Sequence, residues 1–115
     1  MDGNIKYQAL TESTYFILVS LITPLHGYGI MKKASDSSNN RVNLAPGTLY
    51  GALNSLLNKE YIFELKGSSS SSKKEYQITE LGMEVLKSEI TRLHELYNIG
   101  NSIVLNGGKI DEENR

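Results

Sequence analysis

The sequence has no cysteine, no tryptophan, only two prolines and no long hydrophobic run. Without cysteine the chain has no disulfide and no thiol nucleophile, which fits a cytosolic protein. Its longest apolar run, Tyr15–Val19, is far shorter than the roughly 20 residues of a membrane-spanning helix, and no signal peptide is visible. We therefore expect a cytoplasmic protein that has no membrane partner.

The groups that build catalytic and metal sites are also scarce. His26 and His94 are the two histidines; they lie far apart, with no patterned carboxylates and no HExxH motif. We expect His26 to position the turn before a short helix over 30–35. We expect His94 to lie at or beside the interface between two copies of the chain. Because no nucleophile–base pair can be assembled, we expect no enzyme, no cofactor and no metal.

Charge is nearly balanced over the 115 residues, at a formal net charge of −1, but it is segregated. The segment 32–74 has seven bases and three acids, a charge of +4, whereas 79–115 has four bases and seven acids, a charge of −3. A positive segment inside a neutral chain predicts an anionic partner of moderate affinity and steep salt dependence.

The most informative stretch is 46–62. Pro46 suits the first position of a helix, and Leu49, Leu53, Leu56 and Leu57 then recur at helical spacing. The opposite face carries short uncharged groups, namely Thr48, Tyr50, Gly51, Asn54, Ser55 and Asn58. Donors and acceptors without carboxylates are what a helix against DNA requires.

A hairpin is predicted after this helix. Residues 61–65 and 75–78 have strand patterns, and the loop between them carries lysines and a serine run. A helix followed by a hairpin with a basic tip indicates a winged helix-turn-helix. Lys73 and Lys74 in the wing, and Lys32 and Lys33 on the preceding helix, are the expected phosphate contacts.

Two helices are expected upstream. Thr11 has the features of an N-cap for a largely apolar, buried helix over 12–22, which Pro24 ends. A second, short helix is expected over 30–35. The residues 41–45 before Pro46 are expected to be extended.

Thr79 is the expected cap of a last helix that continues to Leu105, roughly 40 Å long at 1.5 Å per residue. Its seam of alternating four- and three-residue steps predicts pairing with a second copy of the chain. The seam residues are Leu86, Ile90, Leu93, Tyr97, Gly100 and Val104. We therefore expect a mainly α fold with a DNA-binding domain over 1–78, a dimerisation helix over 79–105 packed on it, and a disordered tail over 106–115.

The chain resembles the PadR-type family of winged-helix transcriptional regulators. Four ordered motifs carry the resemblance: LTESTY at 10–15, PLHGYGI at 24–30, APGTLYGAL at 45–53 and YQITELG at 76–82. The resemblance implies a homodimer that binds an operator in double-stranded DNA. It also implies a repressor that is released by a small molecule entering near the dimer interface.

The sequence departs from the family pattern in two places. Lys59-Glu60-Tyr61 stands where the family usually ends its recognition helix with glycine, which leaves the geometry of that turn open. Leu93 lies about where some relatives have a tryptophan that binds flat aromatic drugs, so drug binding is not implied. Tyr15, Leu93 and Tyr97 form a candidate effector pocket; the alternative is that they belong to the core or to the dimer interface.

The other assignments have alternatives as well. Tyr50 contacts DNA or packs under the wing, and Gly51 allows close approach of DNA or of another helix. The wing lysines, like Lys32 and Lys33, are phosphate contacts or ordinary solvated charges, and one of Lys32 and Lys33 is expected simply to face solvent. A sequence-specific regulator is the favoured function, and a winged-helix protein–protein module that does not read DNA is the alternative.

Overall fold

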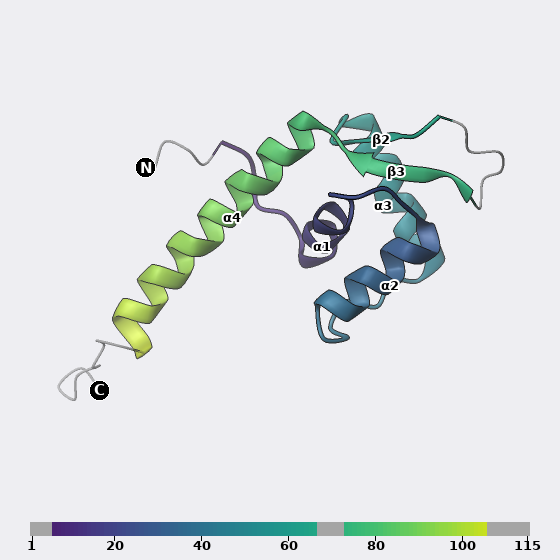
Figure 1. Ribbon diagram of the computed structural model, residues 1–115. Helices are drawn as coiled ribbons and strands as arrows, with labels where there is room; N and C mark the ends of the chain where they lie inside the picture. The colour runs from purple at the N-terminus through teal and green to yellow at the C-terminus, as the bar shows by residue number, and fades with distance from the viewer. Residues whose placement is uncertain (1–5, 67–72, 106–115) are drawn as a thin grey trace. The chain divides into compact units, whose positions relative to one another are not determined.

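The computed structural model describes residues 6–66 and 73–105 (Figure 1). The chain divides into two compact units, one formed by Leu10–Leu86 and the other by Met1–Ala9 together with Lys87–Arg115. The predicted disorder of 106–115 lies outside the described residues. None of the described helices is both long enough and apolar enough to cross a membrane.

Helices predominate, and three short strands form one sheet. The elements are α1 (Glu12–Ser20), β1 (Leu25–His26), α2 (Gly27–Ser37), α3 (Pro46–Asn58), β2 (Ile62–Glu64), β3 (Glu75–Ile78), α4 (Glu80–Gly100) and a π-helical segment (Asn101–Leu105). The sheet is antiparallel in the order β1-β3-β2, with Glu64 opposite Tyr76 on the hairpin. This is the mainly α fold with a hairpin wing that the sequence predicts.

The core of the Leu10–Leu86 unit is aliphatic and is built from every one of its helices. Ile17 and Leu18 of α1, Ile30 of α2 and Leu49 of α3 have no solvent exposure. They belong to one buried cluster that also includes residues from the sheet and the start of α4. As predicted, α1 is central, and Thr11 caps it by accepting a hydrogen bond from the Thr14 amide at 3.1 Å.

The predicted end of the first helix was wrong: α1 stops at Ser20, before Ile22 and well before Pro24. The Leu21 carbonyl instead accepts a hydrogen bond from the Ile78 amide at 2.9 Å, so the chain leaves the helix to meet the sheet. Leu25 and His26 then form β1 against β3, a pairing that two residues could not signal in the sequence.

The second helix is longer than predicted because it begins at Gly27 and ends at Ser37. Glycine is a poor helix former, so the sequence favours a start after Gly29. Both glycines are nevertheless helical, at positions where a side chain does not fit freely: a Cβ on Gly27 would collide with the Tyr50 hydroxyl and one on Gly29 would lie 3.2 Å from Leu25.

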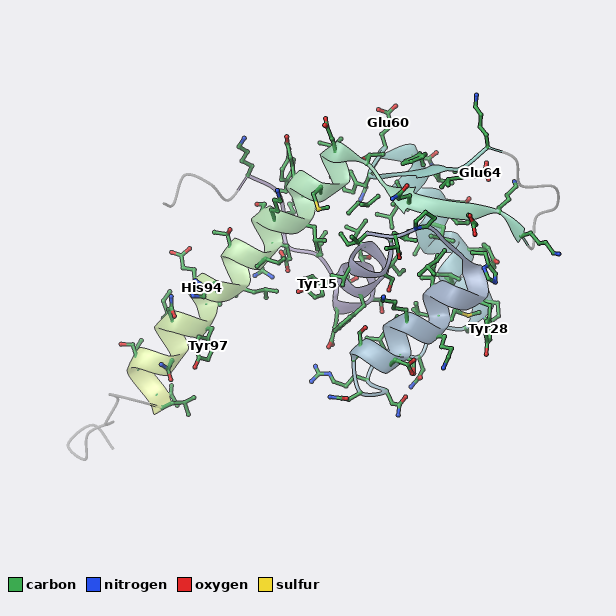
Figure 2. The ribbon with its side chains drawn as sticks, in the orientation of Figure 1. Tyr15, Tyr28, Glu60, Glu64, His94 and Tyr97 are labelled. Atoms are coloured by element: carbon green, nitrogen blue, oxygen red, sulfur yellow. The ribbon has the colours of Figure 1, made fainter. Side chains whose placement is uncertain are left out.

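The turn after α3 keeps the geometry of a glycine cap although Glu60 occupies the position. Glu60 has φ 64°, in the left-handed region. Its amide donates to Leu57 at 3.0 Å and the Tyr61 amide donates to Leu56 at 3.0 Å, the two hydrogen bonds of a Schellman motif. The side chain of Glu60 points outward (Figure 2).

We expect Glu60→Gly to raise the free energy of unfolding by about 1 kcal/mol, because the left-handed region costs a non-glycine residue roughly that much. Lys59, whose φ of −84° is ordinary, is the matched control. Lys59→Gly should lower stability, by roughly 0.5 kcal/mol or more. Urea unfolding measures both, and a Glu60→Gly variant no more stable than the parent would show that this turn is unstrained.

The last helix begins at the predicted cap. Thr79 accepts the Gly82 amide on its hydroxyl at 2.9 Å and the Met83 amide on its carbonyl at 2.9 Å. The regular α-helix ends at Gly100, and the remaining residues up to Leu105 form the π-helical segment. In the second unit the Lys6 amide donates to Ser88 at 3.1 Å, and Arg92 makes a two-pronged ion pair with Glu89.

Candidate nucleic-acid interface

One face of α3 is open to solvent and carries no charge. Thr48, Gly51, Asn54, Ser55 and Asn58 are exposed on it, while Leu49, Leu53 and Leu56 are buried on the other face. Pro46 begins the helix and no residue from Pro46 to Asn58 is ionisable except Tyr50. The exposed face therefore presents hydroxyls and carboxamides, the groups that hydrogen-bond base edges.

Tyr50 combines a packing role with exposure. Its hydroxyl lies against Gly27 at the start of α2, yet 38% of the residue remains accessible. Gly51 differs, because a Cβ built on it would meet nothing within 4 Å. Packing on another helix of the same unit therefore does not explain this glycine, and close approach of DNA stays a prediction.

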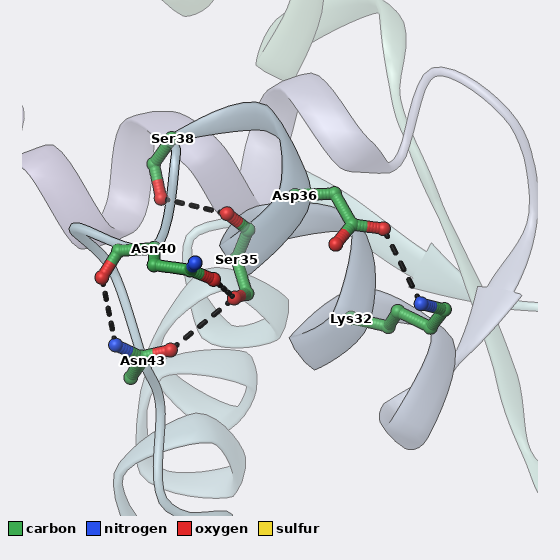
Figure 3. A network of polar contacts seen from close by, with 6 residues as sticks. All are labelled: Lys32, Ser35, Asp36, Ser38, Asn40 and Asn43. Carbon is green, nitrogen blue, oxygen red and sulfur yellow. Dashed lines mark hydrogen bonds and ion pairs between the residues drawn. The ribbon is translucent and has the colours of Figure 1, made fainter.

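Two of the candidate lysines, Lys32 and Lys33, lie on α2, the helix that precedes α3 in the chain. Both Lys32 and Lys33 are exposed, and Lys32 pairs with Asp36 on the next turn at 3.4 Å (Figure 3). Lys33 makes no ion pair with any residue in 6–66 or 73–105. The two lysines thus differ in how far their charge is already neutralised.

The wing lysines differ in the same way. Lys73 is exposed, whereas Lys74 pairs with Glu64 across the hairpin at 3.2 Å. Glu64 stands opposite Tyr76 in the register, so Lys74 is its diagonal neighbour on the same face of the hairpin. Burial first, and Glu64 second, raise the pKa of the Tyr76 phenol.

The turn between α2 and α3 is held by short polar side chains (Figure 3). The Ser35 hydroxyl lies 2.8 Å from Asn40 Oδ1 and 3.2 Å from Asn43 Oδ1, and its one proton can serve only one of them at a time. Asn43 donates to the Asn40 carbonyl at 2.8 Å, and buried Ser38 accepts the Val42 amide at 2.9 Å. These contacts fix the chain that leads into α3.

Sequence reasoning missed one exposed aromatic residue near this turn. Tyr28 on α2, labelled in Figure 2, is 67% exposed. It borders a shallow hollow of about 480 Å³. The hollow is lined by Tyr28, Met31, Lys32, Ser35, Asp36, Asn43, Leu44 and Ala45. The position of Tyr28 in the PLHGYGI motif was the available signal, but the helix was expected to start after this residue.

The predicted dimer seam lies on α4 and beyond. Ile90, Leu93, Tyr97 and Val104 are exposed apolar residues there, as the seam requires. Leu86 is different: it is 3% exposed and belongs to the core cluster of its own unit, so the exposed stripe starts at Ile90. The predicted pocket of Tyr15, Leu93 and Tyr97 takes residues from both units and stays a prediction.

Within the described parts of the chain, no three side chains of His, Asp or Glu gather closely enough to hold a metal ion. The helix-turn-helix formed by α2 and α3, followed by the β2–β3 wing, defines the class: a winged helix-turn-helix protein. The comparisons with known proteins then specify the family.

The family model described as the transcriptional regulator PadR-like family matches residues 17–88, more than half of the chain. The protein therefore belongs to the PadR-like family of transcriptional regulators, a family whose function is DNA-binding regulation. No curated protein sequence matches the chain significantly.

Solved structures agree on the fold. A PadR family transcription regulator from Clostridium difficile R20291 superposes with a TM-score of 0.67 at 22% identity, over 82% of this chain and 99% of that one. A PadR family regulator from Eggerthella lenta DSM 2243 gives 0.66 at 23% identity, over 81% and 82%. A transcriptional regulator from Clostridium thermocellum gives 0.65 at 22% identity, over 80% and 91%.

Proposed function

We propose that this protein is a homodimeric repressor that binds a palindromic DNA operator and is released by a small-molecule effector. The observation that carries the DNA-reading role is the exposed, carboxylate-free face of α3, and the neighbouring elements α2 and the wing carry lysines. In a two-fold dimer the recognition helices enter successive major grooves, about 34 Å apart. Side chains of α3 select the sequence, and lysine–phosphate contacts supply much of the affinity.

The proposal of a homodimer rests on α4. Ile90, Leu93, Leu96 and Tyr97 are all exposed on it, and an exposed apolar row of this kind requires a covering partner. A second copy is the simplest partner, because a two-fold axis lets the same stripe cover itself. The effector remains the least specified part of the proposal, with Tyr15, Leu93 and Tyr97 as candidate lining residues.

Tyr50→Ala tests the reading role of α3. We expect it to weaken binding to operator DNA by about tenfold or more, the range of one good base contact, and to weaken binding to scrambled DNA much less. Fluorescence anisotropy with both duplexes at one salt concentration gives the ratio. Tyr50→Phe, which keeps the ring against Gly27, separates the hydroxyl from the packing.

Equal losses on both duplexes would contradict a base-reading role for Tyr50. Circular dichroism of the two variants is the required check, because the ring also contacts the start of α2. A Tyr50→Ala variant that is folded and binds both duplexes as tightly as the parent would remove Tyr50 from the interface.

A further inference from the structure

Each end of the proposed DNA-binding surface has a lysine that is already paired with a carboxylate. On α2, Lys32 Nζ lies 3.4 Å from Asp36 Oδ2; on the wing, Lys74 Nζ lies 3.2 Å from Glu64 Oε2 (Figure 3 for the first pair). Their neighbours Lys33 and Lys73 have no such ion pair within the described chain. Half of the four candidate phosphate contacts are therefore neutralised internally.

Both pairs are at the surface, so they can open. Side-chain exposures are 62% and 65% for the α2 pair and 43% and 38% for the wing pair. Exposed ion pairs contribute little to stability, and a phosphate can replace the carboxylate without unfolding anything. The two carboxylates are then left beside the phosphate backbone, which repels them.

We propose that Asp36 and Glu64 are specificity-setting residues that compete with DNA phosphates for Lys32 and Lys74. This inference rests on the proposed DNA-binding function. It adds that the two carboxylates lower the affinity of the protein for DNA phosphates. Each phosphate contact made by these lysines requires that an ion pair inside the protein be broken. Sequence-independent attraction to phosphates therefore contributes less to the free energy of binding. Binding then depends more on the uncharged face of α3, where the sequence is read.

The charge distribution agrees with this role. Asp36 and Glu64 are two of only three acids in the segment 32–74, and both lie within ion-pair distance of a candidate phosphate contact. The third acid, Glu60, occupies the turn after α3 and makes no ion pair within the described residues. The acids of this basic segment thus lie mainly where they reduce phosphate contacts.

The test is a double-mutant cycle on non-specific DNA, which requires no knowledge of the operator. The probe is a fluorescein-labelled 30-base-pair duplex of random sequence, measured by anisotropy with the full chain across a sodium chloride series. We expect Glu64→Gln to tighten binding about three- to fivefold and Asp36→Asn about twofold, the range of exposed ion pairs. The log–log salt slope should steepen by up to about 0.9 for each lysine released.

Coupling is the decisive readout. Lys74→Ala should cost less than about twofold in the parent, because Glu64 already neutralises Lys74, and at least about threefold more in the Glu64→Gln background. Lys33→Ala, which removes a lysine without a carboxylate partner, should cost the same in both backgrounds. Glu80→Gln removes the same charge from the start of α4 and should leave the cost of Lys74→Ala unchanged.

Two results would overturn the inference while leaving the proposed function intact. One is an equal cost of Lys74→Ala in both backgrounds; the other is a Glu64→Gln variant no tighter than Glu80→Gln. Absence of DNA binding by the folded parent even at low salt would instead contradict the proposed function, and the inference with it. Circular dichroism establishes that each variant is folded.

Discussion

Replacing Gly82 by alanine is expected to lower the free energy of unfolding by about 3 kcal/mol, the upper range for overpacking a close contact. A Cβ at this position would collide with the Tyr61 carbonyl oxygen and lie 2.8 Å from Ile78 Cγ1. The same carbonyl accepts the Thr79 amide at 2.9 Å, and the Thr79 hydroxyl donates to the Glu60 carbonyl at 2.7 Å. Neither the turn after α3 nor the start of α4 can move away from the added methyl group without losing these hydrogen bonds.

Gly51→Ala is the matched control, since it adds the same methyl group where nothing lies within 4 Å. In an exposed helix it should raise stability by about 0.5–1 kcal/mol. We also expect it to weaken DNA binding by about tenfold, comparable to one lost base contact, because the methyl stands on the proposed reading face. Urea unfolding tests the stability difference; a Gly82→Ala variant as stable as Gly51→Ala would contradict the packing of α4 on this turn.

The second large effect concerns association. Leu93 is 39% exposed on the apolar row of α4, and Leu93→Asp would place one unpaired charge from each copy in the proposed dimer interface. Such a charge costs about 3 kcal/mol or more, which corresponds to at least a roughly hundredfold weaker dimer. Sedimentation velocity at micromolar concentration should show a monomer, and operator affinity should fall with it.

Thr91→Asp provides the control on the same helix. It introduces the same charge on another face, at an exposed residue whose hydroxyl donates to the Lys87 carbonyl at 3.1 Å. We expect Thr91→Asp to sediment like the parent. A dimeric Leu93→Asp variant would show that Leu93 lies outside the interface, and a monomeric parent would contradict the homodimer altogether.

Elements with strong local signals were predictable from the sequence. Pro46 marks the start of α3, Thr79 and Thr11 act as the expected caps, and β3 has the predicted bounds Glu75–Ile78. At the three helix starts one residue determines the boundary through its own backbone or side-chain chemistry, whereas the alternating pattern of Glu75–Ile78 predicts the strand. The uncharged face of α3 was predictable for the same reason, since helical spacing alone separates it from the leucines.

Features that depend on distant contacts were not predictable. The close approach of Tyr50 to Gly27 at the start of α2 joins residues of two helices, and β1 exists only because β3 lies beside it. The burial of Leu86 follows from the core of its own unit, although its spacing fits the exposed seam. The Lys32–Asp36 pair was readable from its four-residue spacing, whereas the Lys74–Glu64 pair required the register of the hairpin.

The most direct test of the DNA-reading role is fluorescence anisotropy of the parent protein across a salt series. The two labelled duplexes would be DNA from upstream of its own gene and a scrambled version of the same composition. We predict tighter binding to the upstream DNA, two chains per site, and an affinity that falls steeply as salt rises. No binding to either duplex, even at low salt, would contradict a DNA-reading regulator and would favour a winged-helix module that binds another protein.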